Sequence, residues 1–333
     1  ILCDVKKQGI TNENHAEFGD KLIDFSGNGR DIQLNNIAWK VDSGIGKYAT
    51  DFTSWINKPT ETFHSKSILE AGNVLRTKSA TSSMKVKVQF DKEAIGLSFR
   101  YFEGGVSKFI YINSNGEYSL PPLEEVGINE FEGFSNNSSS SVTITQIPSH
   151  AGALCLDGVN DFGKVTGMPV YKDYTVVTDR EIFANIGAIS SKNNPGAFVE
   201  TAGNSVYSFG QATSDLNFIF TRSISYLSKY SYCGQSITAG AAEDGTDMWL
   251  GTIRDNDSRF FNGAIYSLMT FPYSMSEFLI ERQLKRYKLG TLYPDMVEFR
   301  PIINVNIGKT YNVFEIRRTD TNELLYYYIN GSA

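Results

Sequence analysis

The chain is poor in cysteine, histidine and net positive charge. Its 333 residues include only three cysteines and three histidines. Cys3, Cys155 and Cys233 lie far apart and form no C-x-x-C pair, so neither a thiolate zinc motif nor a dense disulfide framework is indicated, and we expect free, mostly buried thiols. The net charge of -6 argues against nucleic-acid binding, which needs clustered lysine and arginine.

Long apolar runs are also absent. No segment approaches the roughly 18 apolar residues that span a bilayer, and the first residues lack the apolar core of a signal peptide, so we expect no membrane insertion. The chain begins with Ile1 rather than methionine. We therefore expect a fragment or processed product from which any targeting signal has been removed.

Aromatic residues and glycine, by contrast, are abundant. Aromatic residues make up 13% of the chain and glycine contributes 29 residues, whereas only 20% of residues are charged. This composition suits short strands joined by tight turns. Strands with period-two alternation are expected within residues 66–147 and again from about residue 150, at the regular spacing of a sandwich or jelly roll. The predicted fold class is all-β, and the length allows about two domains.

One helix is predicted, over residues 274–288. Ser274 and Glu277 form an S-x-x-E capping box, and basic residues near the C-terminal end complement the helix dipole. We expect this helix to close the module that precedes it. Residues 291–333 alternate like two or three strands, and we interpret them as a C-terminal β tail or the start of a further domain.

Three stretches resemble motifs of a known family. LIDFSGNGRDIQLNNIAW, residues 22–39, resembles the L-x-D-x-S-G-N-G-x-D-x-x-L-x-N-x-x-W opening of laminin-G-like and concanavalin-A-like lectin modules. GALCLDGVNDFGKV, residues 152–165, resembles their G-x-A-L-x-F-D-G-x-D-D-Y-x-x-V strand pair, and residues 260–273 are similar to their closing strand. The resemblance implies a jelly-roll sandwich of the kind found in gut-bacterial surface proteins and in virion proteins of their phages.

The spacing of the first two motifs predicts an insertion. Such modules usually separate them by a few residues, whereas here about a hundred intervene. We expect one jelly roll formed by residues 1–46 plus 149–290, interrupted by a small β-sandwich at residues 47–148. Gly46 and Gly152 should then lie close together, because an inserted domain enters and leaves its host at neighbouring points.

Catalytic motifs are missing or incomplete. The E-x-D-x-x-E strand of laminarinase-type enzymes is absent, although retaining glycosidases need two carboxyls close together on one face. The histidines are isolated, and neither a G-x-S-x-G elbow nor an H-E-x-x-H helix is present. We expect no enzymatic activity and no required cofactor, with glycoside hydrolysis as a weak alternative.

Oxygen-rich loops are compatible with a structural calcium ion, which takes about six to eight oxygen ligands. The candidate ligands are Asp24, Asn28, Asp31, Asp157, Asp161 and the run Asp255, Asn256 and Asp257. The alternative is that these side chains form Asx turns and cap backbone groups.

Aromatic residues in two stretches are candidates for a sugar-binding platform. Such a site combines exposed rings with polar groups that bind hydroxyls. ISYLSKYSYCG contains Tyr226, Tyr230 and Tyr232, and MWLGTIR contains Trp249. The alternative for alternating tyrosines is half-buried packing. We favour a core position for Trp249 and exposure for at least one tyrosine, because serine and lysine interleave them.

Together these observations predict a non-catalytic carbohydrate-binding or adhesion module of an extracellular or cell-surface protein. The alternative is a structural or fibre module of a phage virion that mediates assembly or host attachment. The expected partner is a glycan or another surface or virion protein, and the tail at residues 291–333 is a candidate for oligomer contacts.

Overall fold

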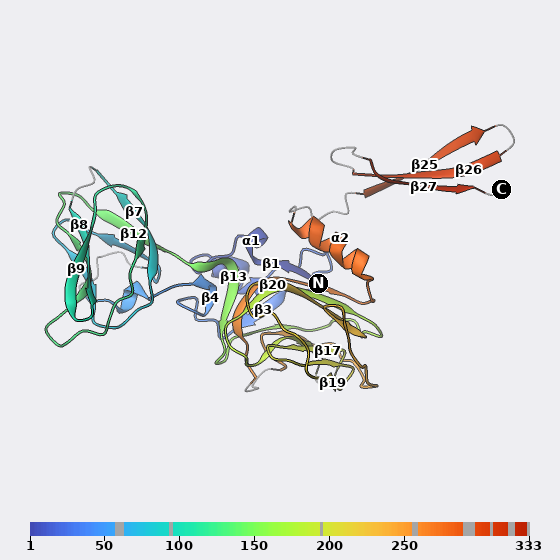
Figure 1. Cartoon of the computed structure of the whole chain (residues 1–333), viewed down its shortest axis with the longest axis horizontal. Coiled ribbons are helices and arrows are strands. Elements are labelled where there is room, and N and C mark those ends of the chain that lie inside the picture. Colours follow the sequence, from blue (N-terminus) through green and yellow to red (C-terminus); the bar gives the residue numbers. More distant parts are fainter. Residues whose placement is uncertain are drawn as a thin grey trace. The chain divides into compact units, whose positions relative to one another are not determined.

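The computed structural model is all-β, as the composition predicts, with strands over 46% and helices over 7% of the chain. The chain divides into two compact units, Ile1–Ser274 and Met275–Ala333 (Figure 1). No helix among the described residues is long and apolar enough to cross a membrane. The structure describes residues 1–56, 63–92, 96–193, 196–254, 259–288, 297–306, 309–318 and 324–331.

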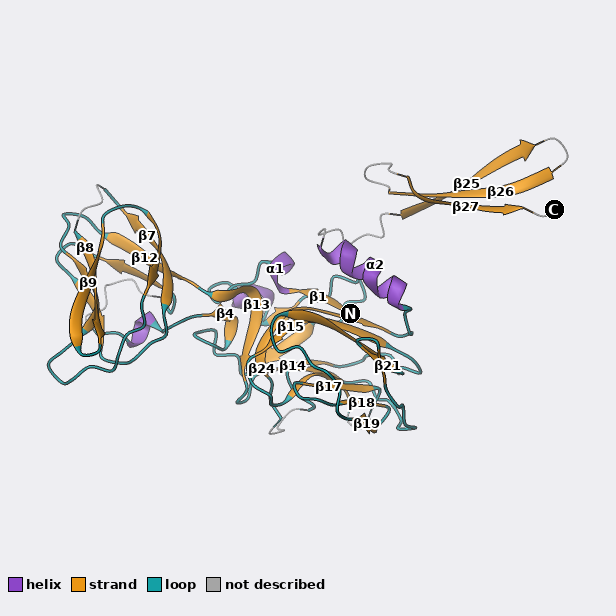
Figure 2. Ribbon diagram, viewed as in Figure 1, coloured by secondary structure: helices purple, strands orange, loops and turns teal. Residues whose placement is uncertain are grey.

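Two eight-stranded antiparallel sheets, here called the first sandwich, belong to the first unit (Figure 2). One sheet contains β1 (Leu2–Asp4), β4 (Gly44–Lys47), β13 (Ser149–Asp157), β15 (Thr175–Ile182), β20 (Ser223–Ser228), β21 (Ser231–Tyr232), β22 (Gln235–Ser236) and β24 (Asn262–Phe271). The other contains β2 (Lys21–Leu22), β3 (Ile32–Asn35), β14 (Phe162–Val165), β16 (Ala188–Lys192), β17 (Phe198–Thr201), β18 (Val206–Ser208), β19 (Gln211–Thr213) and β23 (Met248–Leu250).

Residues from both sheets build one hydrophobic core. Ile32 and Leu34 of β3 are buried on alternate positions and meet Leu154 and Leu268 of the opposite sheet, while Ile37 packs against the same cluster. The apolar residues of this stretch, Ile32, Leu34 and Ile37, thus face the core. Along the chain β13, β14, β15 and β16 lie in alternating sheets, so each connection crosses from one layer to the other. Such crossings are a feature of β-sandwiches.

The chain leaves and re-enters the first sandwich at two neighbouring strands. β4 pairs antiparallel with β13, with Ile45 opposite Leu154 and Lys47 opposite Ser149. Gly46 therefore lies within a few residues of Gly152 across one strand pair, and their expected proximity is confirmed. The positive φ of Gly46, 75°, favours glycine at this irregular crossing.

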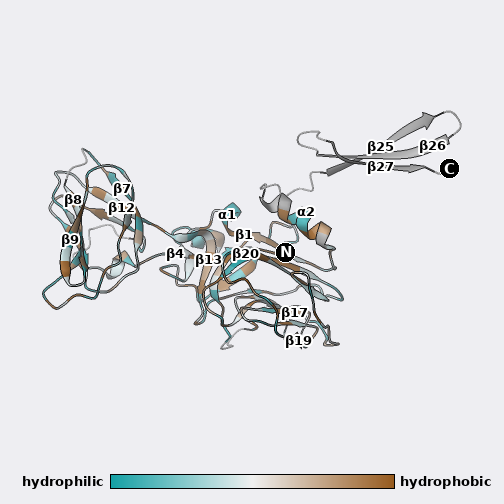
Figure 3. Cartoon of the chain, viewed as in Figure 1, coloured by the Kyte–Doolittle hydropathy of each residue, from teal (hydrophilic) through white to brown (hydrophobic). Residues whose placement is uncertain are grey.

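Eight strands between β4 and β13 form two four-stranded sheets, here called the inserted sandwich. One contains β5 (Lys66–Leu69), β7 (Met84–Phe90), β10 (Gly116–Leu120) and β12 (Val142–Ile147), and the other contains β6 (Val74–Thr77), β8 (Leu97–Glu103), β9 (Val106–Ile112) and β11 (Glu132–Asn136). Buried and exposed residues alternate without exception along β7. Figure 3 shows apolar and polar residues interleaved along these strands. A separate core that includes Trp55 and Phe134 lies between the sheets.

Short helical turns complete the first unit: α1 (Val5–Gln8), η1 (His15–Phe18) and η2 (Phe52–Ser54). The three cysteines are free, as expected, with Cys3 and Cys155 buried and Cys233 half-buried. Burial raises the pKa of Cys155 to about 12, so this thiol is unreactive near neutral pH.

The second unit contains a helix and a three-stranded antiparallel sheet: α2 (Glu277–Lys288), β25 (Val297–Asn306), β26 (Lys309–Arg318) and β27 (Leu324–Gly331). The tail thus forms strands, as predicted. The helix that we expected to close the jelly roll belongs to this second unit. The predicted cap at Ser274 is wrong, because the hydroxyl of Ser276 accepts the Leu279 N–H at 3.4 Å while Ser274 donates to Asp173 at 2.6 Å.

Candidate functional site

The four aromatic residues singled out from the sequence do not form one platform. Tyr230 lies in the turn between β20 and β21 and is 61% exposed, whereas Tyr226 is half-buried on β20 and Tyr232 is buried. Trp249 belongs to the other sheet, is only 7% exposed and packs with Phe162 and Phe260. The expected core position of Trp249 and the exposure of one tyrosine are therefore confirmed.

Tyr232, unlike Tyr230, is held inside the fold by its side-chain contacts. The Tyr232 ring lies 4.7 Å from the Phe218 ring, and its hydroxyl accepts a hydrogen bond from buried Arg180 at 3.3 Å. Burial raises the pKa of Tyr232 above its usual range. Tyr232 thus has a structural role, and Tyr230 is the residue of this stretch that remains accessible to a ligand.

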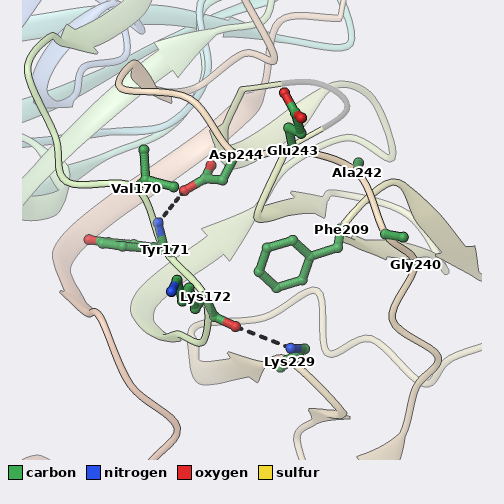
Figure 4. Close-up of a pocket in the computed structure, with 10 residues that line it drawn as sticks. Val170, Tyr171, Lys172, Phe209, Lys229, Gly240, Ala242, Glu243 and Asp244 are labelled. Carbon is green, nitrogen blue, oxygen red and sulfur yellow. Dashed lines mark hydrogen bonds between the residues drawn. The ribbon is translucent and has the colours of Figure 1, made fainter.

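An open groove of about 530 Å³ lies beside this turn (Figure 4). It is lined by Val170, Tyr171, Lys172, Phe209, Lys229, Gly240, Ala241, Ala242, Glu243 and Asp244. These residues come from four separate segments of the chain: the segment before β15, the turn after β18, the β20–β21 turn and the loop before β23. No local motif could therefore have predicted the groove.

Asp244 fixes one wall of the groove. Its carboxylate accepts hydrogen bonds from the backbone N–H of Tyr171 at 2.6 Å and of Ala197 at 3.1 Å, and it pairs with the Lys192 ammonium at 2.5 Å. Both side chains of this ion pair are buried. Burial lowers the pKa of Lys192, although the Asp244 carboxylate opposes that shift. Because both oxygens of Asp244 are engaged, this acid holds the loop in place.

Lys229 connects the groove to Tyr230. Its ammonium donates to the Lys172 carbonyl at 3.1 Å and lies 5.0 Å from the centre of the Phe209 ring and 5.5 Å from that of the Tyr230 ring. Cation–π attraction of this kind holds an amphipathic side chain between two rings. The lysine that interleaves the tyrosines was the one sequence signal for this arrangement.

The first candidate calcium loop is organised around Asp24. One carboxylate oxygen accepts the N–H groups of Leu2 and Ser26, each at 2.9 Å, and the other accepts the Ser26 hydroxyl at 2.8 Å and the Arg30 N–H at 3.1 Å. Asp31 accepts the Asp24 N–H at 3.0 Å. Burial would raise the pKa of Asp24, but the hydrogen bonds from Ser26 and Leu2 lower it below its usual value.

The second candidate loop is a tight turn between β13 and β14. Asp157 accepts the Val159 N–H at 2.8 Å, and Asp161 accepts the Asp157 N–H at 3.1 Å. Burial raises the pKa of Asp161 to about 7. In the first loop, the exposed Asn28 amide donates to the Ser26 hydroxyl at 2.8 Å. Both loops thus use their side chains in the Asx-turn manner that was the alternative to calcium.

The two loops lie at opposite ends of one strand. Asp31 directly precedes β3, whereas Asn35 at the other end of β3 pairs with Phe162, the neighbour of Asp161. About 13 Å of strand separates them, at roughly 3.3 Å per residue. In the part of the chain that the structure describes, no three His, Cys, Asp or Glu residues are grouped as a metal site. Asp255, Asn256 and Asp257 lie outside the described residues.

Comparisons of this chain with protein-family models, with curated proteins and with solved structures found no match.

Proposed function

We propose that this chain is a non-catalytic carbohydrate-binding module of an extracellular or cell-surface protein, built on a concanavalin-A-like jelly roll. The observation that carries the proposal is the open groove beside Lys229 and Tyr230. Sugar rings present apolar C–H faces and many hydroxyls, so their sites pair an aromatic surface with a few placed polar groups. Tyr230 offers an exposed ring, Phe209 a largely buried ring in the groove wall, and Lys229 a donor near both.

The charges of the groove favour binding over hydrolysis. A retaining glycosidase needs two carboxyls that are free to act as acid and nucleophile. Of the two acids that line the groove, Asp244 is held by two backbone N–H groups and by Lys192, and only Glu243 is exposed. A single exposed carboxylate can accept hydrogen bonds from sugar hydroxyls but makes no catalytic pair.

The jelly-roll part of the proposal rests on the two motifs and on the layer crossings. The S-G-N-G and D-G-x-x-D segments form turns organised by Asp24 and Asp161 at the two ends of β3. The strands β13, β14, β15 and β16 alternate between the two sheets, which is compatible with a jelly roll. Fold resemblance alone does not choose a ligand, because function resides in the site.

A glycan array probed with the purified chain tests the proposal. We expect retention on a subset of glycans, and at least a tenfold loss with Tyr230→Ala or Lys229→Ala at an unchanged melting temperature. Phe63→Ala, which removes an exposed aromatic ring of the inserted segment, is the matched control and should bind like the wild type. An array without any retained glycan, or equal binding by the Tyr230 and Lys229 variants, would contradict the proposal.

A second function is an assembly module of a virion or surface fibre. The specific observation in its favour is β9, a seven-residue strand at the edge of the inserted sandwich. Such edges recruit other chains. This function predicts concentration-dependent association of the chain even where no glycan is retained on the array.

A further inference from the structure

The strand β9 is an open edge. It is the last strand in the order β6-β11-β8-β9, and among the described residues it pairs only with β8. The pairing runs without a bulge from Leu97 opposite Ile112 to Glu103 opposite Val106. Figure 1 shows β9 at the margin of the inserted sandwich. One row of backbone N–H and C=O groups along β9 therefore has no neighbouring strand in the described part of the chain.

The edge lacks the features that usually prevent pairing between chains. Proteins protect edges by keeping them short, charged, bulged or interrupted by proline. β9 has seven residues, more than the four of β5 and β6 or the five of β10 at the other edges of this sandwich. Its only charged residue is Lys108, which is already ion-paired with Glu103 on β8.

The outer face of β9 carries two exposed aromatic rings. Phe109 is 51% exposed and Tyr111 is 71% exposed, and their ring centres lie 6.3 Å apart with the planes inclined by 18°. Arg100 lies opposite Phe109 on β8 and donates to the Ser107 hydroxyl at 3.0 Å. Because burial of apolar surface is favourable, a partner that covers these two rings would lower the free energy of the protein.

The opposite face of β9 anchors the strand in the core. Ile112 is fully buried, and Ile110 packs against the core of the inserted sandwich. These contacts fix which residues point outward, because successive side chains of a strand alternate between faces. The core contacts of β9 thus orient the aromatic pair already in the single chain.

We infer that β9 pairs antiparallel with β9 of a second copy of this chain, about a two-fold axis through Ile110. In this register Phe109 faces the partner's Tyr111, and Tyr111 faces the partner's Phe109. Aromatic pairs directly across two strands stabilise a sheet. Lys108 faces the partner's Ile112, so no like charges oppose each other, and the four strands of each copy join into one continuous sheet.

The sequence of β9 favours a second copy over an unrelated partner. A two-fold contact brings the same patch together twice, so the patch must complement itself. A centre at Lys108 would oppose two ammonium groups, and a centre at Phe109 would place Tyr111 against the partner's Ser107. Only the centre at Ile110 pairs both rings. The contact is smaller than a standard interface, so we expect dissociation constants in the micromolar range.

Analytical ultracentrifugation of the full chain tests this inference. From about 1 to about 500 μM, a range that brackets a micromolar dissociation constant, the weight-average mass should rise toward twice that of the monomer. The variant Phe109→Lys/Tyr111→Lys opposes lysines across the axis and should weaken association at least tenfold. Phe109→Lys/Tyr111→Glu opposes unlike charges in the same register and should restore it.

Ile128→Lys/Val159→Lys is the control, since it adds two lysines at exposed positions away from β9 and should associate like the wild type. Circular dichroism of each variant checks that the fold is retained. A wild type that stays monomeric refutes the inference and leaves this face to a glycan or another protein. Association that persists in the double lysine variant also refutes it and points to another surface. Failure of the lysine–glutamate variant to associate overturns the Ile110 register.

Discussion

Asp161 should make the first sandwich lose stability as the pH rises from about 4 to about 8. Its carboxyl is fully buried in the turn before β14, and burial raises its pKa from 3.8 to about 7. A carboxyl whose pKa is higher in the folded than in the unfolded state stabilises the fold most when both states are protonated. That contribution is complete below about pH 4 and is lost as the pH rises through 7.

The size of the effect follows from the shift. Each pKa unit corresponds to about 1.4 kcal/mol, so about three units amount to roughly 4 kcal/mol at most. The substitution Asp161→Asn keeps an oxygen that can accept the Asp157 N–H but removes the ionisation. Between pH 4 and pH 8, the free energy of unfolding of the wild type should therefore fall by on the order of 3 kcal/mol relative to that of the Asp161→Asn variant.

Urea unfolding at several pH values measures this difference. In a Trp55→Phe background the tryptophan fluorescence comes only from Trp39 and Trp249 of the first sandwich. Chelator-treated protein is required, because a bound cation would favour the ionised carboxyl. Asp215→Asn, an exposed substitution, serves as the control and should follow the wild-type profile. Parallel pH profiles for the wild type and the Asp161→Asn variant would refute the reasoning.

Three further outcomes are expected. Trp249→Ala should lower the free energy of unfolding by about 3 to 5 kcal/mol, whereas Tyr230→Ala should change it by less than about 0.5 kcal/mol, because only the first ring is buried; equal losses in urea titrations would contradict this. Lys192→Met should cost about 3 to 5 kcal/mol by leaving the buried Asp244 carboxylate without its cation, and adding Asp244→Asn should recover part of the loss. If calcium binds, millimolar Ca²⁺ should raise the melting temperature of chelator-stripped protein; an unchanged curve counts against a site at Asp24 or elsewhere.

Several features of the fold could be predicted from local patterns. Strict alternation over Met84–Phe90 marked a strand with one buried face, and the structure has β7 there. The spacing of the two motifs predicted that Gly46 and Gly152 would lie close together, and the pairing of β4 with β13 confirms it. Period-two alternation carries this information because the geometry of a single strand determines which side chains share a face.

The cap of α2 shows where prediction from a short sequence motif fails. Ser274 begins the S-x-x-E pattern, and Ser276 directly precedes α2. The hydroxyl of Ser274 is bound to Asp173, a residue about a hundred positions away in the sequence, and Ser276 is the residue that contacts the first turn. A motif of four residues cannot predict a competing hydrogen bond to a residue that is distant in the sequence.

What the sequence by itself determined is the all-β class and the alternating strands such as β7, with its one buried face. What only the tertiary structure decided is the site. Tyr230 and Tyr232 are two residues apart, yet one is exposed in a turn and the other is buried against Phe218. The groove joins four distant segments, and burial is the largest cause of the raised pKa of Asp161. The exposure of a side chain, its pKa and the lining of a pocket depend on the residues that surround it in the fold. The local periodicity of the sequence does not show which distant residues those are.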